Sequence, residues 1–462
     1  MSMYIQQLYT GCLAQAAYYI ESDGEAAIID PLRDTQVYLD IANARKATIK
    51  YVFETHFHAD FVSGHIDLVK KTGAKVVYGP KAQAGYDIIS ADDGTIFKLG
   101  KCSVELIHTP GHTLESCCFL VKDENNKPTS VFTGDTLFVG DIGRVDLAVK
   151  QTLSKEDLAG MMYESIEKLK RLPDDLIVYP GHGNGSACGK NIGKESTTTM
   201  GAQKKGNYAM QPMTKDAFVK MAVNGLETPP QYFFVDAVIN RNGYADNMES
   251  LLQKNVRAID VEDFKKASDV NHVILDTRSA EDFAACHIPG AINIGLGGQF
   301  AIWVGSLFGD VPFLLICDEG KENESVMRLA RVGYDKVDGY LKGGVNAWKA
   351  AGNPTQTIES VSADEFVKHI GKGSKLIDVR NEGEVSNGTI KEAINIPLAT
   401  LPKKLAELDK NTHYYVYCQG GYRSMIANSI LQKNGFNNIT NVIGGMGAIS
   451  KTGIELEVSV EV

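Results

Sequence analysis

The N-terminal part of the chain contains the sequence Lys50-Tyr-Val-Phe-Glu-Thr-His-Phe-His-Ala-Asp60. The first five residues of this stretch, Lys50 to Glu54, are typical of a largely buried strand, and they run directly into two histidines and an aspartate. In α/β proteins, the loops that follow strands carry the chemistry at the sheet edge. The stretch therefore predicts a polar site at the end of a strand.

Three further apolar segments end in the same manner. Each is followed by a short loop that contains a histidine or an aspartate, namely Thr109-Pro-Gly-His112, Thr133-Gly-Asp135 and Tyr179-Pro-Gly-His182. Four such loops would gather imidazoles and carboxylates at one edge of a sandwich, and a cation would relieve the charge of that cluster. The predicted strands are Lys50 to Glu54, Val104 to Ile107, Ser130 to Phe132 and Leu176 to Val178.

Two other segments of this region differ in the periodicity of their apolar residues. Lys155 to Arg171 is predicted to be a helix that Ser154 caps and that buries Leu158, Met161, Met162, Ile166 and Leu169. Ser196 to Pro212 has no clear period, so we expect a loop or linker there.

The C-terminal half contains an internal repeat. Asp276 returns as Asp378, a spacing of 378 − 276 = 102, and Cys317 returns as Cys418, a spacing of 418 − 317 = 101. Each copy alternates short apolar runs with helical patterns, which is typical of a parallel α/β sheet. The sequence therefore predicts three domains, at residues 1–257, 258–355 and 357–462.

Length and composition agree with several globular domains and exclude some partners. A chain of 462 residues allows about three domains, and 44% hydrophobic residues are ordinary for globular proteins. A net charge of −10 disfavours nucleic acid and anionic membrane surfaces as partners. The eight cysteines are too sparse for a disulfide framework and no run of 18 apolar residues occurs, so we expect a cytoplasmic protein without a membrane span.

Taken in order, the four loops resemble the metallo-β-lactamase superfamily over roughly the first 200 residues. The resemblance implies an N-terminal αββα sandwich. Hydrolases of this superfamily carry the pattern His-x-His-x-Asp-His, whereas this chain has Phe61 at the last position. Phenylalanine cannot bind a metal, which leaves Asp60, His182 and a shared Asp135 at best for a second ion and disfavours a two-metal hydrolase.

The departure at Phe61 narrows the resemblance to the persulfide dioxygenase branch. That branch implies one Fe(II) per chain held by His56, His112 and Asp135, with positions left open for dioxygen and sulfur. His58, Asp60 and His182 would then orient these ligands or a bound water. The alternative is a zinc site made of His56, His58, His112 and Asp135.

Two residues near these loops are candidates for binding the substrate. Arg144 corresponds to a substrate-contacting arginine of the branch and would pair with a carboxylate or phosphate of a thiol carrier. The alternative for Arg144 is an ion pair with Asp146. Cys188 is either a relay thiol facing the iron pocket or an inert buried cysteine. The aromatic residue of glutathione-using members is absent after His182, which disfavours glutathione as the carrier.

The last domain carries a reactive loop, Cys418-Gln-Gly-Gly-Tyr-Arg423, between a predicted strand and a predicted helix. Its glycines let backbone N–H groups point inward, and the helix start adds positive potential, so a thiolate or persulfide at Cys418 is stabilised. Arg423 would add a positive charge at the rim. The domain resembles a rhodanese, which implies a sulfane sulfur carried on Cys418.

The middle domain keeps this scaffold but changes the loop. After Cys317 it reads Asp-Glu-Gly-Lys-Glu-Asn-Glu, and carboxylates near a thiol disfavour the thiolate. We therefore expect an inactive rhodanese-like module, a spacer or docking surface, in which Cys317 and Cys286 are structural.

Together, the α/β multidomain architecture predicts a bifunctional sulfur enzyme of sulfide detoxification. An iron site would oxidise a low-molecular-weight thiol persulfide with O2 to sulfite, and Cys418 would transfer sulfur to give thiosulfate, in either direction. The expected partners are these small molecules and further copies of the chain in a homo-oligomer. The alternatives are a zinc-dependent thioester hydrolase of the glyoxalase II kind and a non-catalytic sulfur carrier.

Overall fold

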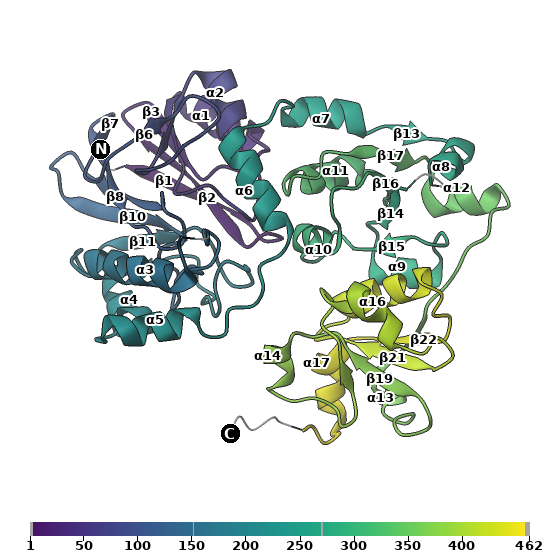
Figure 1. Ribbon diagram of the computed structural model, residues 1–462. Helices are drawn as coiled ribbons and strands as arrows, with labels where there is room; N and C mark the ends of the chain where they lie inside the picture. The colour runs from purple at the N-terminus through teal and green to yellow at the C-terminus, as the bar shows by residue number, and fades with distance from the viewer. Residues whose placement is uncertain (1–2, 151, 269–270, 458–462) are drawn as a thin grey trace. The chain divides into compact units, whose positions relative to one another are not determined.

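The computed structural model describes residues 3–150, 152–268 and 271–457. The chain divides into two compact units, the first made of residues up to 250 with 330–333, and the second of residues 251–329 with 334–462 (Figure 1). The outermost residues of the predicted domains, 1–2 and 458–462, lie outside the described residues. No helix in the described part of the chain is long and apolar enough to cross a membrane.

The first unit contains two six-stranded sheets, each with parallel and antiparallel neighbours. The first sheet has the order β1 (Tyr4–Thr10), β2 (Gln15–Ser22), β3 (Glu25–Ile29), β4 (Thr48–Phe53), β5 (Lys75–Tyr78) and β6 (Ile89–Ser90). The second has the order β12 (Thr198–Thr199), β11 (Ile177–Pro180), β10 (Pro128–Gly134), β9 (Cys117–Lys122), β8 (Cys102–His108) and β7 (Ile96–Leu99).

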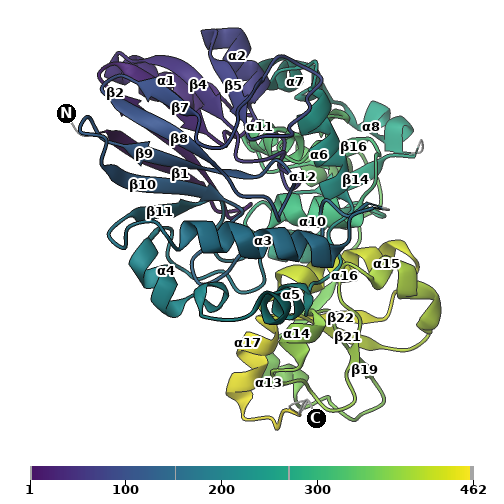
Figure 2. The same ribbon diagram turned by 60° about the vertical axis from the view of Figure 1, so that its left-hand side comes forward.

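The sheets pack face to face through apolar side chains, and helices cover their outer faces. Tyr18 and Phe53 of the first sheet belong to one buried cluster with Phe119 and Phe132 of the second. Helices α1 (Gln36–Arg45) and α2 (His65–Thr72) bury Tyr38, Ala42 and Leu68 against the first sheet. Helices α3 (Lys155–Leu169), α4 (Met200–Gly206) and α5 (Lys215–Val223) pack on the second, as Figure 2 shows. The predicted αββα sandwich is confirmed.

The predicted helix at Lys155 is confirmed together with its cap. The Ser154 side chain accepts a hydrogen bond from the Asp157 backbone N–H, and the Asp157 carboxylate accepts one from the Ser154 N–H in return. Four residues of the predicted stripe are buried, whereas Met161 is partly exposed. The helix ends at Leu169, two residues before the predicted end.

The expectation of a loop or linker at Ser196 to Pro212 is wrong. This segment forms β12, α4 and a 3-10 turn at Tyr208–Met210. Met200 and Met210 are buried in the cluster beneath α3, and the Asn207 amide donates to the carbonyls of Phe138 and Asp141. Two methionines among polar residues give too weak a period to predict a helix of seven residues.

The second unit contains two five-stranded, all-parallel sheets with the same strand order. The middle domain has β13 (Ala258–Ile259), β17 (Val337–Leu341), β16 (Phe313–Ile316), β14 (Val273–Asp276) and β15 (Ile292–Asn293). The last domain has β18 (Glu359–Val361), β22 (Ile439–Val442), β21 (Tyr414–Tyr417), β19 (Lys375–Asp378) and β20 (Ile394–Asn395). The matching order confirms the repeat seen in the sequence.

Helices alternate with these strands in both copies. The middle domain has α8 (Val261–Ser268), α9 (Ala280–Ala285), α10 (Phe300–Leu307), α11 (Glu322–Ala330) and α12 (Gly344–Ala350). The last domain has α13 (Ala363–Phe366), α14 (Glu382–Val385), α15 (Leu401–Lys404), α16 (Tyr422–Lys433) and α17 (Gly445–Ile449). Two more helices, α6 (Tyr232–Asn242) and α7 (Met248–Asn255), precede the first copy.

Candidate functional site

The four predicted loops meet at one edge of the sandwich. His56, His112, Asp135 and His182 follow β4, β8, β10 and β11, and each of the four side chains is at most 2% exposed. Glycine allows the loops to approach closely. A Cβ atom at Gly181 would lie 2.7 Å from Asp135 Oδ1, so a larger residue there would push into the cluster.

A first group of possible ligands consists of His56, His112 and Asp135, whose ligand atoms all lie within 4.8 Å of one another. Asp135 Oδ2 is 3.4 Å from His112 Nε2 and 4.0 Å from His56 Nε2. Among the residues that the structure describes, no hydrogen-bond partner is found for His56 Nε2, for His112 Nε2 or for either carboxylate oxygen of Asp135. Buried polar atoms are normally paired, so this cluster has the form of a site that a cation completes.

The hydrogen bonds on the far side of each ring fix which nitrogen carries the proton. His112 Nδ1 lies 2.8 Å from the Arg144 carbonyl oxygen, which only accepts, so Nδ1 donates and Nε2 presents its lone pair. His56 Nδ1 lies 3.0 Å from Thr55 Oγ1, and that hydroxyl already donates to Asp30 Oδ2 at 2.9 Å. His56 therefore also donates through Nδ1, and both Nε2 atoms face Asp135 as ligands would.

A second group contains Asp60, His182 and Cys188, all buried and again with ligand atoms within 4.8 Å of one another. His182 Nε2 lies 3.2 Å from Asp60 Oδ2 and 3.5 Å from Asp135 Oδ1, while Nδ1 donates to the Ala14 carbonyl at 3.2 Å. Asp135 Oδ2 thus faces the first group of possible ligands, and Asp135 Oδ1 faces the second. The structure brings the predicted Cys188 to the site together with Asp60 and His182.

His58 belongs to a third group, with Asp30 and Glu54, and its ring centroid is 4.2 Å from that of His56. Its Nε2 atom is 3.1 Å from Asp30 Oδ1 and 3.3 Å from Glu54 Oε2, and all three side chains are buried. Burial opposes a charge on His58, yet the two carboxylates outweigh it and raise the pKa of His58 well above its ordinary value. The sequence did not single out Asp30 or Glu54, because their only signal is a place near a strand end.

Burial and the neighbouring imidazoles of His58, His112 and His182 have the opposite effect on His56, whose pKa they lower well below its ordinary value. His56 is thus the neutral ring and His58 the charged one. The Phe61 ring is fully buried, with its centroid 4.3 Å from that of His58. The position that carries a ligand in the hydrolase pattern is therefore filled by an apolar ring.

Arg144 adopts the ion pair with Asp146. Its Nε and Nη2 atoms donate to the two Asp146 oxygens at 2.7 and 2.8 Å, and the guanidinium also donates to the carbonyls of Ala187 and Glu227. The Arg144 backbone N–H donates to the Cys188 carbonyl at 2.8 Å. Through these bonds Arg144 connects the loop of His112 with the loop of Cys188. Contact between Arg144 and a substrate stays a prediction.

In the second unit, Cys418 sits where β21 ends and α16 begins. The Gly421 N–H donates to Cys418 Sγ at 3.1 Å, and the Ser424 hydroxyl lies 3.8 Å from that sulfur. Gly421 has φ +98°, a left-handed conformation that glycine adopts without strain and that turns its N–H inward. One backbone N–H of the predicted glycine loop, that of Gly421, thus points at the thiol.

Arg423, which the sequence predicts to add a positive charge at the rim, forms an ion pair with Glu384. Its Nη1 and Nη2 atoms donate to the two Glu384 oxygens at 2.5 and 2.6 Å. Burial raises the pKa of Glu384, but the Arg423 charge outweighs burial and lowers it. Because Glu384 lies 39 residues earlier in the chain, on α14, the sequence reasoning did not pair it with the loop.

Cys317 of the middle domain has a different environment. Burial is the main cause that raises its pKa to about 11, and the charges of Asp276 and Glu322 add to it, while the hydroxyls of Ser325 and Thr277 oppose it. The two rhodanese-like copies share one ion pair between an aspartate and an arginine. Arg278 Nη2 lies 2.6 Å from Asp276 Oδ2, and Arg380 Nη2 lies 2.6 Å from Asp378 Oδ2.

Comparison with known proteins places these sites in families. Residues 10–182 match the metallo-beta-lactamase superfamily, and residues 260–351 and 362–452 each match the rhodanese-like domain. A solved metallo-beta-lactamase from Staphylococcus aureus subsp. aureus COL is 33% identical, with a TM-score of 0.67; the match covers 74% of this chain and 99% of that one. The chain belongs to the metallo-beta-lactamase superfamily. Its two rhodanese-like domains follow the metallo-beta-lactamase domain.

Two curated relatives match the metallo-beta-lactamase domain. A probable hydroxyacylglutathione hydrolase, glo2, of Schizosaccharomyces pombe is 35% identical over 159 residues, and a hydroxyacylglutathione hydrolase of Polaromonas sp. is 34% identical over 188. These matches cover 34% and 39% of this chain. They span 58% and 66% of the relatives' own lengths.

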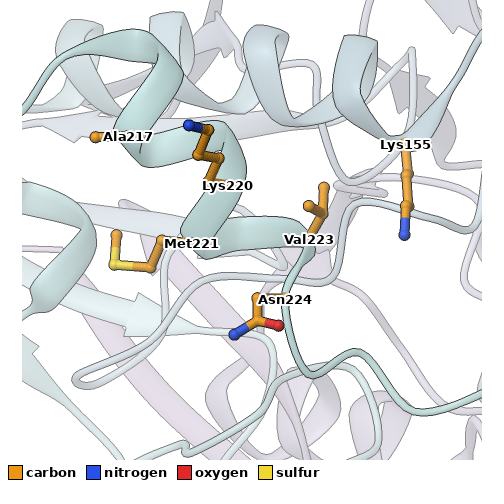
Figure 3. Close-up of a pocket in the computed structure, with 6 residues that line it drawn as sticks. All are labelled: Lys155, Ala217, Lys220, Met221, Val223 and Asn224. Atoms are coloured by element: carbon orange, nitrogen blue, oxygen red, sulfur yellow. The ribbon is translucent and has the colours of Figure 1, made fainter.

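A surface hollow elsewhere in the metallo-beta-lactamase domain has no such chemistry. It lies between the start of α3 and the end of α5, and Lys155, Ala217, Lys220, Met221, Val223 and Asn224 line it (Figure 3). These six residues include no carboxylate, imidazole or thiol. A second hollow, beside the reactive loop of the last rhodanese-like domain, is lined in part by Gln419, Gly420 and Lys451.

Proposed function

We propose that the metallo-beta-lactamase domain is an Fe(II)-dependent persulfide dioxygenase and that the last rhodanese-like domain transfers sulfur through Cys418. The observation that carries the first part is the set of His56, His112 and Asp135, whose ligand atoms lie within 4.8 Å of one another without hydrogen bonds to any described residue, while His58 Nε2 lies against Asp30 and Glu54. Two imidazoles and one carboxylate form the donor set of non-haem Fe(II) oxygenases, which leaves positions for dioxygen and substrate. One ferrous ion per chain fits this set.

The chemistry that iron would supply is activation of dioxygen beside a bound persulfide. In the overall reaction, a thiol persulfide, O2 and water give the thiol and sulfite. The S–S bond breaks, the sulfane sulfur loses four electrons, and O2 gains them. Three oxygens, two from O2 and one from water, end on sulfur.

The residues of the chain would hold this centre and its substrate. The Arg144 carbonyl and the Thr55 hydroxyl orient His112 and His56 through their Nδ1 atoms. Asp60 and His182, on the other side of Asp135, would accept and return the protons of the persulfide and water. Cys188 lies with them and would contact the sulfur substrate.

The sulfur-transfer part rests on the Cys418 loop. The Gly421 N–H and the start of α16 favour negative charge on Cys418 Sγ. With a persulfide on Cys418, sulfite would attack the outer sulfur, which forms thiosulfate and returns the Cys418 thiolate without net oxidation. The reverse transfer, from thiosulfate, would load Cys418. The hollow lined in part by Gln419 and Lys451 would admit such anions.

For the middle rhodanese-like domain we propose no sulfur transfer, because burial, together with the charges of Asp276 and Glu322, raises the pKa of the Cys317 thiol to about 11. We retain domain limits at 1–257, 258–355 and 357–462. We also propose a cytoplasmic homo-oligomer that acts in sulfide detoxification.

A zinc-dependent thioester hydrolase is the second candidate. Two relatives are named hydroxyacylglutathione hydrolases, and Asp60 and His182 lie beside Asp135 as a second ion would need. Hydrolysis of an acyl thiol without any need for O2 would establish this function. A sulfur carrier that hands persulfide to a partner is the remaining alternative, and it requires no metal at His56.

Metal analysis of protein purified without air tests the proposal. We expect about one iron per chain, and sulfite from a panel of thiol persulfides only when O2 is admitted. Metal-free protein reloaded with Fe(II) should recover this activity, whereas protein reloaded with Zn²⁺ should not. Stoichiometric zinc without iron in an active preparation would contradict the proposal.

A further inference from the structure

Tyr422, the residue before Arg423 in the reactive loop, contacts the middle rhodanese-like domain. The Tyr422 hydroxyl donates to the Gly295 carbonyl of the middle rhodanese-like domain at 2.7 Å. Its ring lies on Gly298, where a Cβ atom would come within 2.5 Å of the ring carbons. Gly298 therefore leaves space that the Tyr422 ring fills.

The contact continues along α16, the helix that starts at Tyr422. Met425 is buried in a cluster otherwise built mainly from the middle domain, and Ser429 Oγ accepts from the Asn293 N–H at 3.1 Å. Gln432 Oε1 lies 2.7 Å from His287 Nε2. Positions 422, 425, 429 and 432 recur at three and four residues, so they form one face of the helix.

A different face of the same helix contacts the Cys418 thiol. The Ser424 hydroxyl lies 3.8 Å from Cys418 Sγ and donates to Asn441 Oδ1 at 2.7 Å, within the last domain. The helix α16 thus carries the middle domain on one face and the reactive loop on another. A shift of the middle-domain face would move the loop with it.

Hydrogen bonds within the middle domain fix the segment that contacts Tyr422. Leu296, next to Gly295, accepts a hydrogen bond through its carbonyl from Arg328 Nη1 at 2.5 Å. The Asn293 amide donates to the carbonyls of Asp276 and Arg278 at 3.1 and 3.0 Å, as Asn395 does to Asp378 and Arg380 in the last domain. The middle copy has changed its own Cys317 loop while keeping the scaffold that faces Tyr422.

We propose that the middle rhodanese-like domain positions the Cys418 loop, and that Tyr422 on Gly295 and Gly298 is the contact that does so. The inference rests on the proposed role of Cys418 in sulfur transfer. The Gly421 N–H that meets Cys418 Sγ belongs to the residue next to Tyr422, so displacing Tyr422 tilts this donor away from the sulfur. Tyr422 is thus a positioning residue, and the middle domain supports the chemistry of its neighbour.

The test compares two adjacent glycines in the full chain. A Cβ at Gly297 meets nothing within 4 Å, whereas one at Gly298 meets the Tyr422 ring, so Gly297→Ala is the matched control for Gly298→Ala. Three quantities are measured. They are kcat and KM for sulfur transfer from thiosulfate to a thiol, and the rate at which iodoacetamide alkylates Cys418, read by peptide mass spectrometry.

We expect Gly298→Ala to lower kcat and the Cys418 alkylation rate together by about tenfold, with little change in KM, because the loop loses its aligned donor. Tyr422→Phe keeps the ring and removes the hydroxyl, so it should lower both rates by a smaller factor. Tyr334→Phe removes a similar hydroxyl-to-carbonyl bond, to Phe308 at 2.5 Å, and should change neither.

Equal rates for Gly298→Ala and Gly297→Ala, with Tyr422→Phe equal to wild type, would overturn the inference. If Gly298→Ala does not fold, Tyr422→Phe against Tyr334→Phe decides alone. A wild-type chain that takes no sulfur from thiosulfate or persulfide would refute the proposed transfer instead, and the alkylation rates would still test the positioning of the loop.

Discussion

His58 Nε2 lies 3.1 Å from Asp30 Oδ1, so this histidine forms an ion pair with a buried carboxylate beside the proposed ligand His56. Glu54 meets the same nitrogen at 3.3 Å. The second histidine of the His-x-His pair therefore neutralises buried carboxylates, while the first, His56, turns a bare nitrogen toward Asp135. The two histidines therefore turn their Nε2 atoms toward different carboxylates.

The two histidines are predicted to differ when each is replaced by glutamine. His56→Gln should lose iron, because a ligand is removed. His58→Gln should keep about one iron per folded chain but unfold more easily, by about 3 kcal/mol, since Asp30 and Glu54 lose their cationic partner. Iron content and urea unfolding of both variants check this. Equal iron loss in both would show that His58 is a ligand.

Cys317 is predicted to resist alkylation at neutral pH. With a pKa of about 11, only about one thiol in a thousand is ionised at pH 8, and the thiolate is the reactive form. The folded pKa is above the ordinary value, so this site stabilises the fold fully below pH ~9 and loses that contribution as the pH rises through the folded pKa. Peptide-resolved alkylation between pH 7 and 10 should show Cys418 reacting first; comparable rates would contradict the inactive role of the middle domain.

Glu384 is predicted to weaken the attraction of the loop for anions, because its carboxylate pairs with Arg423. Glu384→Gln should lower KM for thiosulfate several-fold and reduce stability by about 1 kcal/mol, since the pair is partly exposed. Because the folded pKa of Glu384 is lowered, that contribution is present at neutral pH and is lost as the pH falls through the folded pKa.

The control for Glu384→Gln is Glu382→Gln, an exposed carboxylate on the same short helix. It changes the net charge equally without touching Arg423. Steady-state kinetics at fixed salt should separate the two variants, and an equal KM for both would remove Glu384 from any role in specificity.

Cys188→Ala is predicted to keep its iron and to oxidise persulfide about tenfold more slowly, because the thiol lies with Asp60 and His182, beside the proposed ligand Asp135. Cys102→Ala is the matched control, since Cys102 is also buried but begins β8 at the opposite end from His112. Iron content and oxygen uptake measure the effect. Unchanged uptake in Cys188→Ala would make Cys188 an inert core residue.

Much of this architecture could be predicted because its signals are local. Ser154 with Asp157 marks a helix start, the offset of about 102 residues between Asp276 and Asp378 reveals a repeat, and strands that end in histidine or aspartate locate the site. What could not be predicted depends on distant partners. Neither the pairing of Glu384 with Arg423 nor that of Tyr422 with Gly295 has a local pattern, because each joins different segments.

Oxygen uptake with a thiol persulfide, compared between wild type and Cys418→Ser, tests both proposed activities in one experiment. We predict that both consume one O2 for each persulfide oxidised and release sulfite, and that only wild type then converts sulfite to thiosulfate when more persulfide is present. Thioester hydrolysis without oxygen uptake by wild type, or thiosulfate formation that survives in Cys418→Ser, would contradict the account.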